Sequence, residues 1–206
     1  MKVVSLAGPS DAGKTTLVEA LVPRLTDRGR RVATVKSIHH AVEIDTPGTD
    51  THRHRTAGAE AVVGVTPDVT FEITGRGKRD PPDGESGVDP DSLRDPGFDG
   101  DADRRERRAL ASTLARLERR GYDVVLVEGF AAASLPTILV GDRDRSAVGG
   151  TVVARGDDDV DDLVETIEDL ESRSVLRSEP RESERGDRPN PGTAGRGTGL
   201  DSKSSP

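Results

Sequence analysis

Nine residues, Gly8 to Thr16, have the types and spacing of a phosphate-binding loop. They read Gly-Pro-Ser-Asp-Ala-Gly-Lys-Thr-Thr and fit the pattern G-x-x-x-x-G-K-[ST]. Gly8 and Gly13 let the backbone curl so that successive N–H groups point at phosphate oxygens. Lys14 would contact the β- and γ-phosphates, and the Thr15 hydroxyl would be a ligand of Mg²⁺. The motif predicts a nucleoside triphosphate without specifying its base. The other residues expected to bind it are Ser10, Asp11, Ala12 and Thr16.

A carboxylate that could complete this site is Glu128. It comes directly after Tyr122-Asp123-Val124-Val125-Leu126-Val127. The four consecutive apolar residues of this run indicate a central strand that is buried on both faces and has Glu128 at its C-terminal end. Open α/β sheets bind their ligands at the carboxyl ends of strands. In P-loop proteins this strand supplies an acidic residue near Mg²⁺. We therefore expect Glu128 to be catalytic and to belong to the metal site, with Gly129 allowing close approach.

The segment 37–55 holds the other candidate ligands. Asp45-Thr46-Pro47-Gly48 matches the loose D-x-x-G pattern of GTPases, in which the Asp contacts Mg²⁺ through water and the Gly senses the γ-phosphate. All four histidines lie in the same segment, at positions 39, 40, 52 and 54. Imidazole is a common metal ligand, but these residues show no fixed two-ligand spacing with carboxylates. The residues alone leave open a GTPase element, a metal site and a solvated loop.

The elements that must position these residues read as an α/β fold. The strand–loop–helix order around the motif and the next strand make a parallel pair with a right-handed crossover. The whole chain predicts a P-loop NTPase with a mostly parallel central sheet, flanking helices and a small hairpin extension. Pro23 should kink the first helix or end it early. The expected strands are 2–7, 31–36, 61–66, 68–74, 122–127, 136–140 and 151–154, and the expected later helices are 104–120 and 160–170.

Two tracts are expected to be disordered because they are rich in Gly, Pro, Asp and Arg and poor in apolar residues. The first is an insert, Gly75–Asp103, and the second is a tail, Ser172–Pro206. The prediction is therefore one nucleotide-binding domain over residues 1–171, interrupted by the insert.

Composition limits the function classes. The chain has 206 residues, a net charge of −8 and no cysteine, which excludes thiol catalysis and thiolate metal sites. Aspartate exceeds glutamate and arginine far exceeds lysine, as expected for a salt-loving organism or for a GC-rich genome. The acidic charge argues against a nucleic-acid partner. No apolar run is long enough to span a membrane and no signal peptide is evident, so we expect a cytoplasmic protein.

The combination of motifs resembles the MobB-type family of molybdopterin-guanine dinucleotide biosynthesis accessory proteins. The likeness covers residues 2 to about 170 apart from the insert, and it depends on the order and spacing of its parts. One departure is Ser37, where the family commonly has His directly after the Lys. Beyond the P-loop, the parts are Val35-Lys36-Ser37-Ile38-His39-His40, Asp45-Thr46-Pro47-Gly48-Thr49-Asp50, Arg55, Ala57-Gly58-Ala59 and Leu126-Val127-Glu128-Gly129-Phe130.

The resemblance implies a GTP-binding accessory protein, usually dimeric, with at most slow Mg²⁺-dependent GTP hydrolysis. It implies a molybdopterin guanylyltransferase as partner, together with molybdopterin-binding proteins, and it places Asp45 near the Mg²⁺. It also implies that His39 and His40 occupy motif positions. No Arg finger or water-orienting Gln is evident in the sequence. Two alternatives stay open: a small-molecule kinase with a lid at Arg104-Arg105-Glu106-Arg107-Arg108, and a metal-delivery GTPase that uses the histidines.

Overall fold

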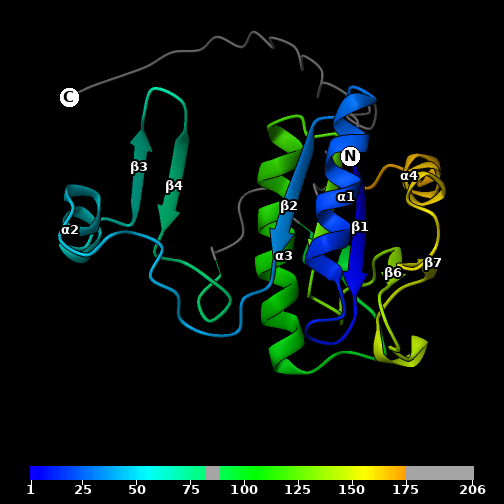
Figure 1. The fold of residues 1–206 in the computed structure, drawn as a ribbon. Coiled ribbons are helices and arrows are strands. Elements are labelled where there is room, and N and C mark those ends of the chain that lie inside the picture. Colours follow the sequence, from blue (N-terminus) through cyan, green and yellow to red (C-terminus); the bar gives the residue numbers. More distant parts are fainter. Residues whose placement is uncertain (82–88, 175–206) are drawn as a thin grey trace, which may run out of the picture.

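The computed structural model describes residues 1–81 and 89–174, and its centre is a sheet of five parallel strands (Figure 1). The strand order is β2-β5-β1-β6-β7, so β1, which leads into the P-loop, lies in the middle. The predicted parallel α/β architecture is confirmed. The strands are β1 (Lys2–Ala7), β2 (Val32–Lys36), β5 (Val124–Glu128), β6 (Thr137–Leu139) and β7 (Val152–Arg155).

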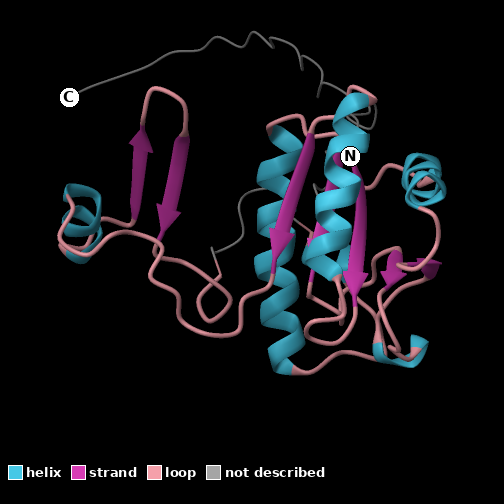
Figure 2. Ribbon diagram, in the orientation of Figure 1, coloured by secondary structure: helices cyan, strands magenta, loops and turns pink. Residues whose placement is uncertain are grey.

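Helices cover both faces of this sheet (Figure 2). Alternate residues of a strand point to opposite faces, and here Val125 and Val127 of β5 pack with α3 (Asp101–Arg119). Val124 and Leu126 pack instead with α1 (Lys14–Asp27) and α4 (Val160–Asp169). The four consecutive apolar residues of β5, Val124 to Val127, are therefore explained by burial on both sides.

Helix α1 continues through Pro23, so of the two expected effects of proline, a kink or an early end, the early end was wrong. Pro23 lies on the exposed side of the helix, and it removes only one backbone donor. Leu17, Leu21 and Leu25 on the opposite side are all buried in the core. The burial of this apolar stripe holds the helix together across the missing hydrogen bond.

An arm stands outside the three layers, beyond α3 (Figure 1). It contains α2 (Asp50–Thr56), which the sequence reading missed, and the predicted hairpin of β3 (Ala61–Val65) and β4 (Thr70–Thr74). The two strands pair only with each other, in antiparallel register, and form a separate sheet. Helix α2 is short and none of its residues is buried. Its sequence therefore has no apolar periodicity from which a helix could be predicted.

The disorder expected over Gly75–Asp103 was wrong for residues 75–81 and 89–103, both of which the structure describes. Pro90–Leu93 forms a 3-10 helix whose Leu93 is fully buried against Leu110 and Leu114 of α3. Arg107 of α3 is 4% exposed and donates to the carbonyl of Phe98, at 2.6 Å. Burial of one leucine and one guanidinium therefore fastens a strongly polar segment to the domain. Residues 82–88 lie outside the described part of the chain.

Of the predicted tail, residues 172–174 are described and the remainder is not. Arg173 attaches this end to the domain, because its backbone N–H donates to the carbonyl of Met1 at 2.8 Å and its side chain donates to the carbonyl of Ser134. Burial lowers the pKa of Arg173. No helix in the described ranges is long and apolar enough to cross a bilayer.

Candidate functional site

The loop between β1 and α1 has the backbone shape that its sequence predicts. Asp11 and Gly13 both adopt left-handed conformations, with φ of 59° and 92°. Helix α1 begins directly after Gly13, which caps it without a side chain, so the N–H groups of its first turn face the loop. Curled backbone followed by a helix N-terminus favours an anion. These residues therefore fit a phosphate group.

Gly8 is required for a different reason, which is the close approach of the loop to the end of β6. A Cβ atom at this position would lie 2.2 Å from the carbonyl oxygen of Val140. Gly141, which follows Val140, also lies against the loop. A Cβ atom added to Gly141 would lie 3.1 Å from the Cβ of Ala12. The loop after β6 is thus packed directly on the phosphate-binding loop.

Lys14 lies at the start of α1 and folds back over the loop. Its ammonium donates to the carbonyl of Gly8 at 3.0 Å and to the carbonyl of Pro9. No carboxylate among the described residues pairs with Lys14, so its positive charge is balanced only by backbone dipoles. Such a cation beside a ring of N–H groups is well suited to an incoming phosphate.

Glu128 ends β5 at the same edge of the sheet, as predicted. It lines one cavity, of about 320 Å³, together with Lys14, Thr15 and Lys36. The Nζ atom of Lys36 lies 3.0 Å from Oε1 of Glu128, and β2 and β5 place these two residues opposite each other in register. The structure therefore brings six of the eight predicted loop residues into one cavity with the predicted carboxylate, and Gly8 and Ala12 do not line it. The loop residues that line this cavity are Ser10, Asp11, Gly13, Lys14, Thr15 and Thr16.

Behind the loop lies a second cleft of about 530 Å³, which shares Ser10, Lys14 and Glu128 with the first cavity. Its other walls come from the residues after β2, from α3 and from the loops after β5 and β6. Gly129 shapes its floor, because a Cβ there would lie 2.4 Å from the Cβ of Ser37. The sequence motifs include Ser37, His39, Gly129 and Phe130, which line this cleft, but they do not include Arg143 and Ala147. These two reach the cleft through contacts between distant segments, which no local motif encodes.

Asp45 is not brought to this site. It lies in the arm beside the start of α2, where its Oδ1 accepts hydrogen bonds from the hydroxyls of Thr49 and Thr51, both at 3.2 Å. Among the described residues it lines neither cavity that contains Lys14. Its backbone N–H and Arg55 both donate to Glu43, which holds the pKa of Glu43 below its ordinary value. Asp45 here organises the turn that precedes α2.

The histidines are spread over this arm and the second cleft. His39 lines the cleft, and its Nε2 lies 3.5 Å from the hydroxyl of Ser37. The Nδ1 of His52 accepts from the N–H of Gly48 at 3.3 Å, while His40 and His54 are exposed. Within residues 1–81 and 89–174, no three His, Asp or Glu side chains gather in a cluster that could hold a metal ion.

Two of the four arginines considered for a kinase lid are engaged elsewhere. Arg104 and Arg107 both pair with Asp99, with N–O distances of 3.3 and 2.9 Å. Together with Arg94 they hold the pKa of Asp99 far below its usual range, and the Arg104 hydrogen bond is the largest cause. These side chains fix the segment before α3 instead of reaching over the nucleotide loop.

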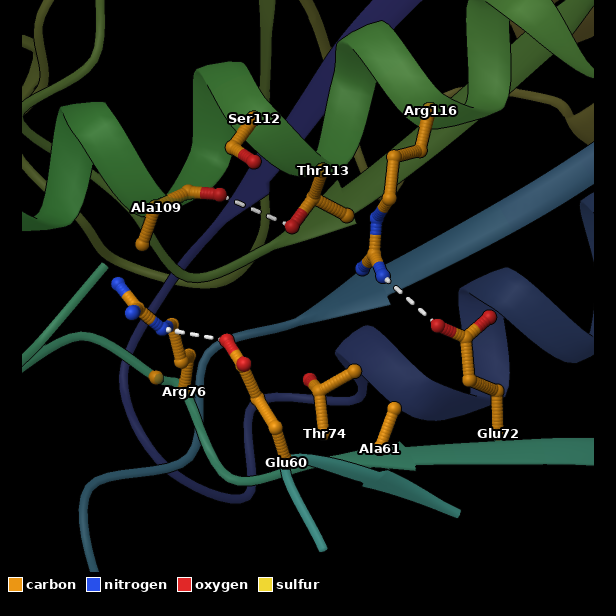
Figure 3. A pocket seen from close by; sticks show the side chains of 10 residues that line it. Glu60, Ala61, Glu72, Thr74, Arg76, Ala109, Ser112, Thr113 and Arg116 are labelled. Carbon is orange, nitrogen blue, oxygen red and sulfur yellow. Dashed lines mark hydrogen bonds and ion pairs between the residues drawn. The ribbon is translucent and has the colours of Figure 1, made fainter. Parts of the chain in front are cut away.

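A third cavity, of about 480 Å³, separates the arm from α3 (Figure 3). Glu72 of β4 faces Arg116 of α3 across it, 3.8 Å apart, and Arg76 faces Glu60 on the same wall at 3.1 Å. Its charged side chains are thus paired with one another. The cavity marks the junction at which the hairpin is held to the domain.

Comparisons with known proteins identify the relatives of this chain. Residues 3–83 match the family described as molybdopterin guanine dinucleotide synthesis protein B, MobB. A protein of Methanocaldococcus jannaschii assigned as a molybdopterin-guanine dinucleotide biosynthesis adapter is 38% identical over 151 residues, which are 71% of this chain and 50% of that protein. The adapter protein of Haemophilus influenzae is 39% identical over 61 residues, 30% of this chain and 34% of its own. The chain therefore spans half or less of these relatives.

The fold is also that of a solved relative. The crystal structure of Bacillus subtilis MobB matches with a TM-score of 0.54 at 18% identity, over 81% of this chain and 98% of that one. This likeness agrees with the parallel sheet and flanking helices described above.

Proposed function

The chain belongs, through residues 3–83, to the family of molybdopterin guanine dinucleotide synthesis protein B, and from this premise we propose that it is a GTP-binding adapter in molybdenum cofactor biosynthesis. Its relatives in Methanocaldococcus jannaschii and Haemophilus influenzae carry the name of adapter proteins for molybdopterin-guanine dinucleotide biosynthesis. In this role it holds the nucleotide while a separate guanylyltransferase performs the transfer.

The observation that carries the proposal is the convergence of the P-loop with Glu128 at one edge of the sheet. The left-handed turn at Asp11 and Gly13, the N-terminus of α1 and the charge of Lys14 all favour phosphate at the same place. Glu128 shares the cavity with Thr15, and these two side chains are the oxygen ligands that Mg²⁺ prefers.

In the bound state, Thr15 would hold Mg²⁺ directly and Glu128 would hold its waters, while Mg²⁺ would neutralise charge on the phosphates. Lys14 would leave the carbonyls of Gly8 and Pro9 and bind the triphosphate. No glutamine among the described residues lines the two cavities to orient an attacking water, which agrees with slow hydrolysis at most. The chain binds and presents GTP more than it consumes it.

For the partners, we propose a molybdopterin guanylyltransferase and a second copy of this chain. The arm supports a role in assembly, because its outer strand exposes Val63 and Val65, at 58% and 78%, instead of burying them. Exposed aliphatic residues gathered on one projecting element are typical of interaction surfaces.

Calorimetric titration with GTP and with ATP, each with Mg²⁺, tests the proposal. We expect selective binding of GTP and its loss by roughly 100-fold or more in Lys14→Ala, since charge-assisted hydrogen bonds to the phosphates disappear. Lys2→Ala, on the opposite end of β1, is the matched control and should bind as the wild type does. A clear preference for ATP, or rapid transfer of phosphate to an added metabolite, would favour the small-molecule kinase instead.

A further inference from the structure

Arg143 lines the second cleft and comes from outside the nucleotide loop. Among the described residues it has no acidic partner. It lies in the loop after β6 and lines the cleft with Ser10 and Lys14. Its Nη2 donates to the carbonyl of Ala147 at 2.9 Å, which fixes the guanidinium in the wall. Its Nε is shielded from solvent and has no hydrogen-bond partner in the described structure. A buried N–H left in this state is costly unless a ligand satisfies it.

This lack of a partner is unusual in so acidic a chain, in which acidic residues outnumber Lys and Arg by 38 to 30. The neighbouring carboxylate of Asp144 does not compensate for it, because Asp144 accepts from the N–H and the hydroxyl of Ser146, at 2.8 and 2.9 Å. These hydrogen bonds lower the pKa of Asp144. Its carboxylate caps the N-terminus of the 3-10 helix Arg145–Ala147.

The carboxylates that line the cleft are likewise engaged. Glu128 pairs with Lys36, and Glu106 pairs with Lys78 at 3.0 Å. Asp103 accepts from the N–H of Gly100 at 3.2 Å, as part of the cap of α3. Three charged side chains that line the cleft bond only to backbone groups in the described structure: Asp103, Lys14 and Arg143. Two of the three are cations, and both Lys14 and Arg143 can donate to an anion.

The loop that carries Arg143 is held at a fixed position relative to the phosphate site. Gly141 lies on Ala12, and its carbonyl accepts from Arg155 of β7 at 3.2 Å. The end of β6 approaches Gly8 so closely that no side chain fits between them. Arg143 is thus built into the wall beside Lys14 by packing, and needs no second chain to deliver it.

We propose that Arg143 binds a phosphate group in the cleft beside Lys14, as a residue supplied by this same chain. The proposal rests on the nucleotide binding proposed above. The phosphate has two possible sources: the terminal phosphate of the bound nucleotide or a separate phosphate ester that enters the cleft next to it. An arginine suits both, because its planar guanidinium can donate two hydrogen bonds to one phosphate.

The test compares Arg143→Ala and Arg143→Gln with Arg145→Ala, an exposed arginine of the same loop that serves as the matched control. Affinities for GDP and for a non-hydrolysable GTP analogue are measured by calorimetry with Mg²⁺, and inorganic phosphate is titrated into the GDP-loaded protein. We expect both Arg143 variants to lose about 10-fold in binding of one phosphate species, while GDP affinity and the Arg145 variant change by less than ~2-fold.

A selective loss for the triphosphate analogue assigns Arg143 to the nucleotide. A selective loss for inorganic phosphate assigns it to a second phosphate ester. The proposal is overturned if neither affinity changes, if Arg145→Ala has the same effect, or if GDP affinity in Arg143→Gln falls as much as that of the analogue, which would mean that Arg143 only supports the loop. Failure of the wild type to bind GTP would instead refute the function proposed above.

Discussion

Lys36 and Glu128 form an ion pair across the carboxyl ends of two neighbouring strands, with 3.0 Å between Nζ and Oε1. The carboxylate that we expect beside Mg²⁺ is thus neutralised by a lysine from the adjacent strand. Lys36 is 55% exposed, so it can swing away, whereas Glu128 is only 16% exposed and stays in place. We therefore propose that Mg²⁺ competes with Lys36 for Glu128.

The first prediction concerns Glu128→Gln. The change removes the charge that would hold the metal's waters while preserving the size of the side chain. We expect the increase in GTP affinity that Mg²⁺ produces to fall by about 10-fold or more, with little change in affinity measured in EDTA. Calorimetry with and without Mg²⁺ measures both, and an equal loss in the two conditions would show that Glu128 does not act through the metal.

Asp45→Asn should behave differently. Because Asp45 contacts Thr49 and Thr51 and lines neither cavity of the site, we expect the Mg²⁺-dependent affinity for GTP to stay within ~2-fold of the wild type. A loss matching that of Glu128→Gln would contradict the placement. It would mean that the arm moves toward the loop when nucleotide binds.

Gly129 and Ser37 are expected to be coupled. Gly129→Ala places a Cβ 2.4 Å from that of Ser37 and forces alanine to φ 89°, which should destabilise the fold by about 2 kcal/mol or more. In a Ser37→Gly background the steric part disappears, so the cost of Gly129→Ala should fall to about 1 kcal/mol.

Gly58→Ala is the control for this pair, because its φ is 105° and no heavy atom lies within 4 Å of the added Cβ. Urea denaturation of the variants measures the free energies of unfolding. Equal costs for Gly129→Ala in the two backgrounds would exclude the steric coupling.

Leu93→Ala tests whether the segment before α3 belongs to the core. Leu93 is fully buried in the cluster under α3, so the substitution should destabilise the protein by about 2–5 kcal/mol. Val65→Ala, at a side chain that is 78% exposed, should change stability by less than about 0.5 kcal/mol. Similar melting temperatures for the two variants would place Leu93 outside the cooperative unit.

Asp99 predicts a pH dependence of stability. Its pKa is depressed by Arg104, Arg94 and Arg107, so its contribution is fully present above the ordinary carboxyl pKa, about 4, and is lost as pH falls below that value. The stability difference between the wild type and Asp99→Asn should therefore shrink on acidification from pH 5 to about pH 2. Melting temperatures across this range measure it, and a difference that is constant with pH would rule out the ionised pair as its origin.

The sequence predicted the centre of the molecule well because local signals there agree with one another. The P-loop fits between an apolar strand and a helix with leucines at helical spacing, and the all-apolar strand before Glu128 is explained by burial on both faces. The family resemblance and the parallel fold were both confirmed. GTP, Mg²⁺ and the roles of the site residues stay predictions.

The errors have a common physical origin, which is tertiary contact. Residues 89–103 are almost wholly polar, and what orders them is the insertion of Leu93 under α3 together with the burial of Arg107. Helix α1 survives Pro23 because its opposite face is buried. Arg143 was not singled out, since its position beside Lys14 depends on how the end of β6 packs against Gly8.

The placement of β1 in the middle of the sheet has a consequence for biosynthesis. Lys2 of this strand pairs with Val124 on one side, and Ser5 pairs with Thr137 on the other, so both partners are translated more than a hundred residues later. The nucleotide loop therefore emerges from the ribosome early but has no sheet to hold it until the chain has passed residue 137. Until then the apolar residues of β1 stay exposed, and chaperones can bind them. Strand pairing between residues so far apart in the sequence is slow to form.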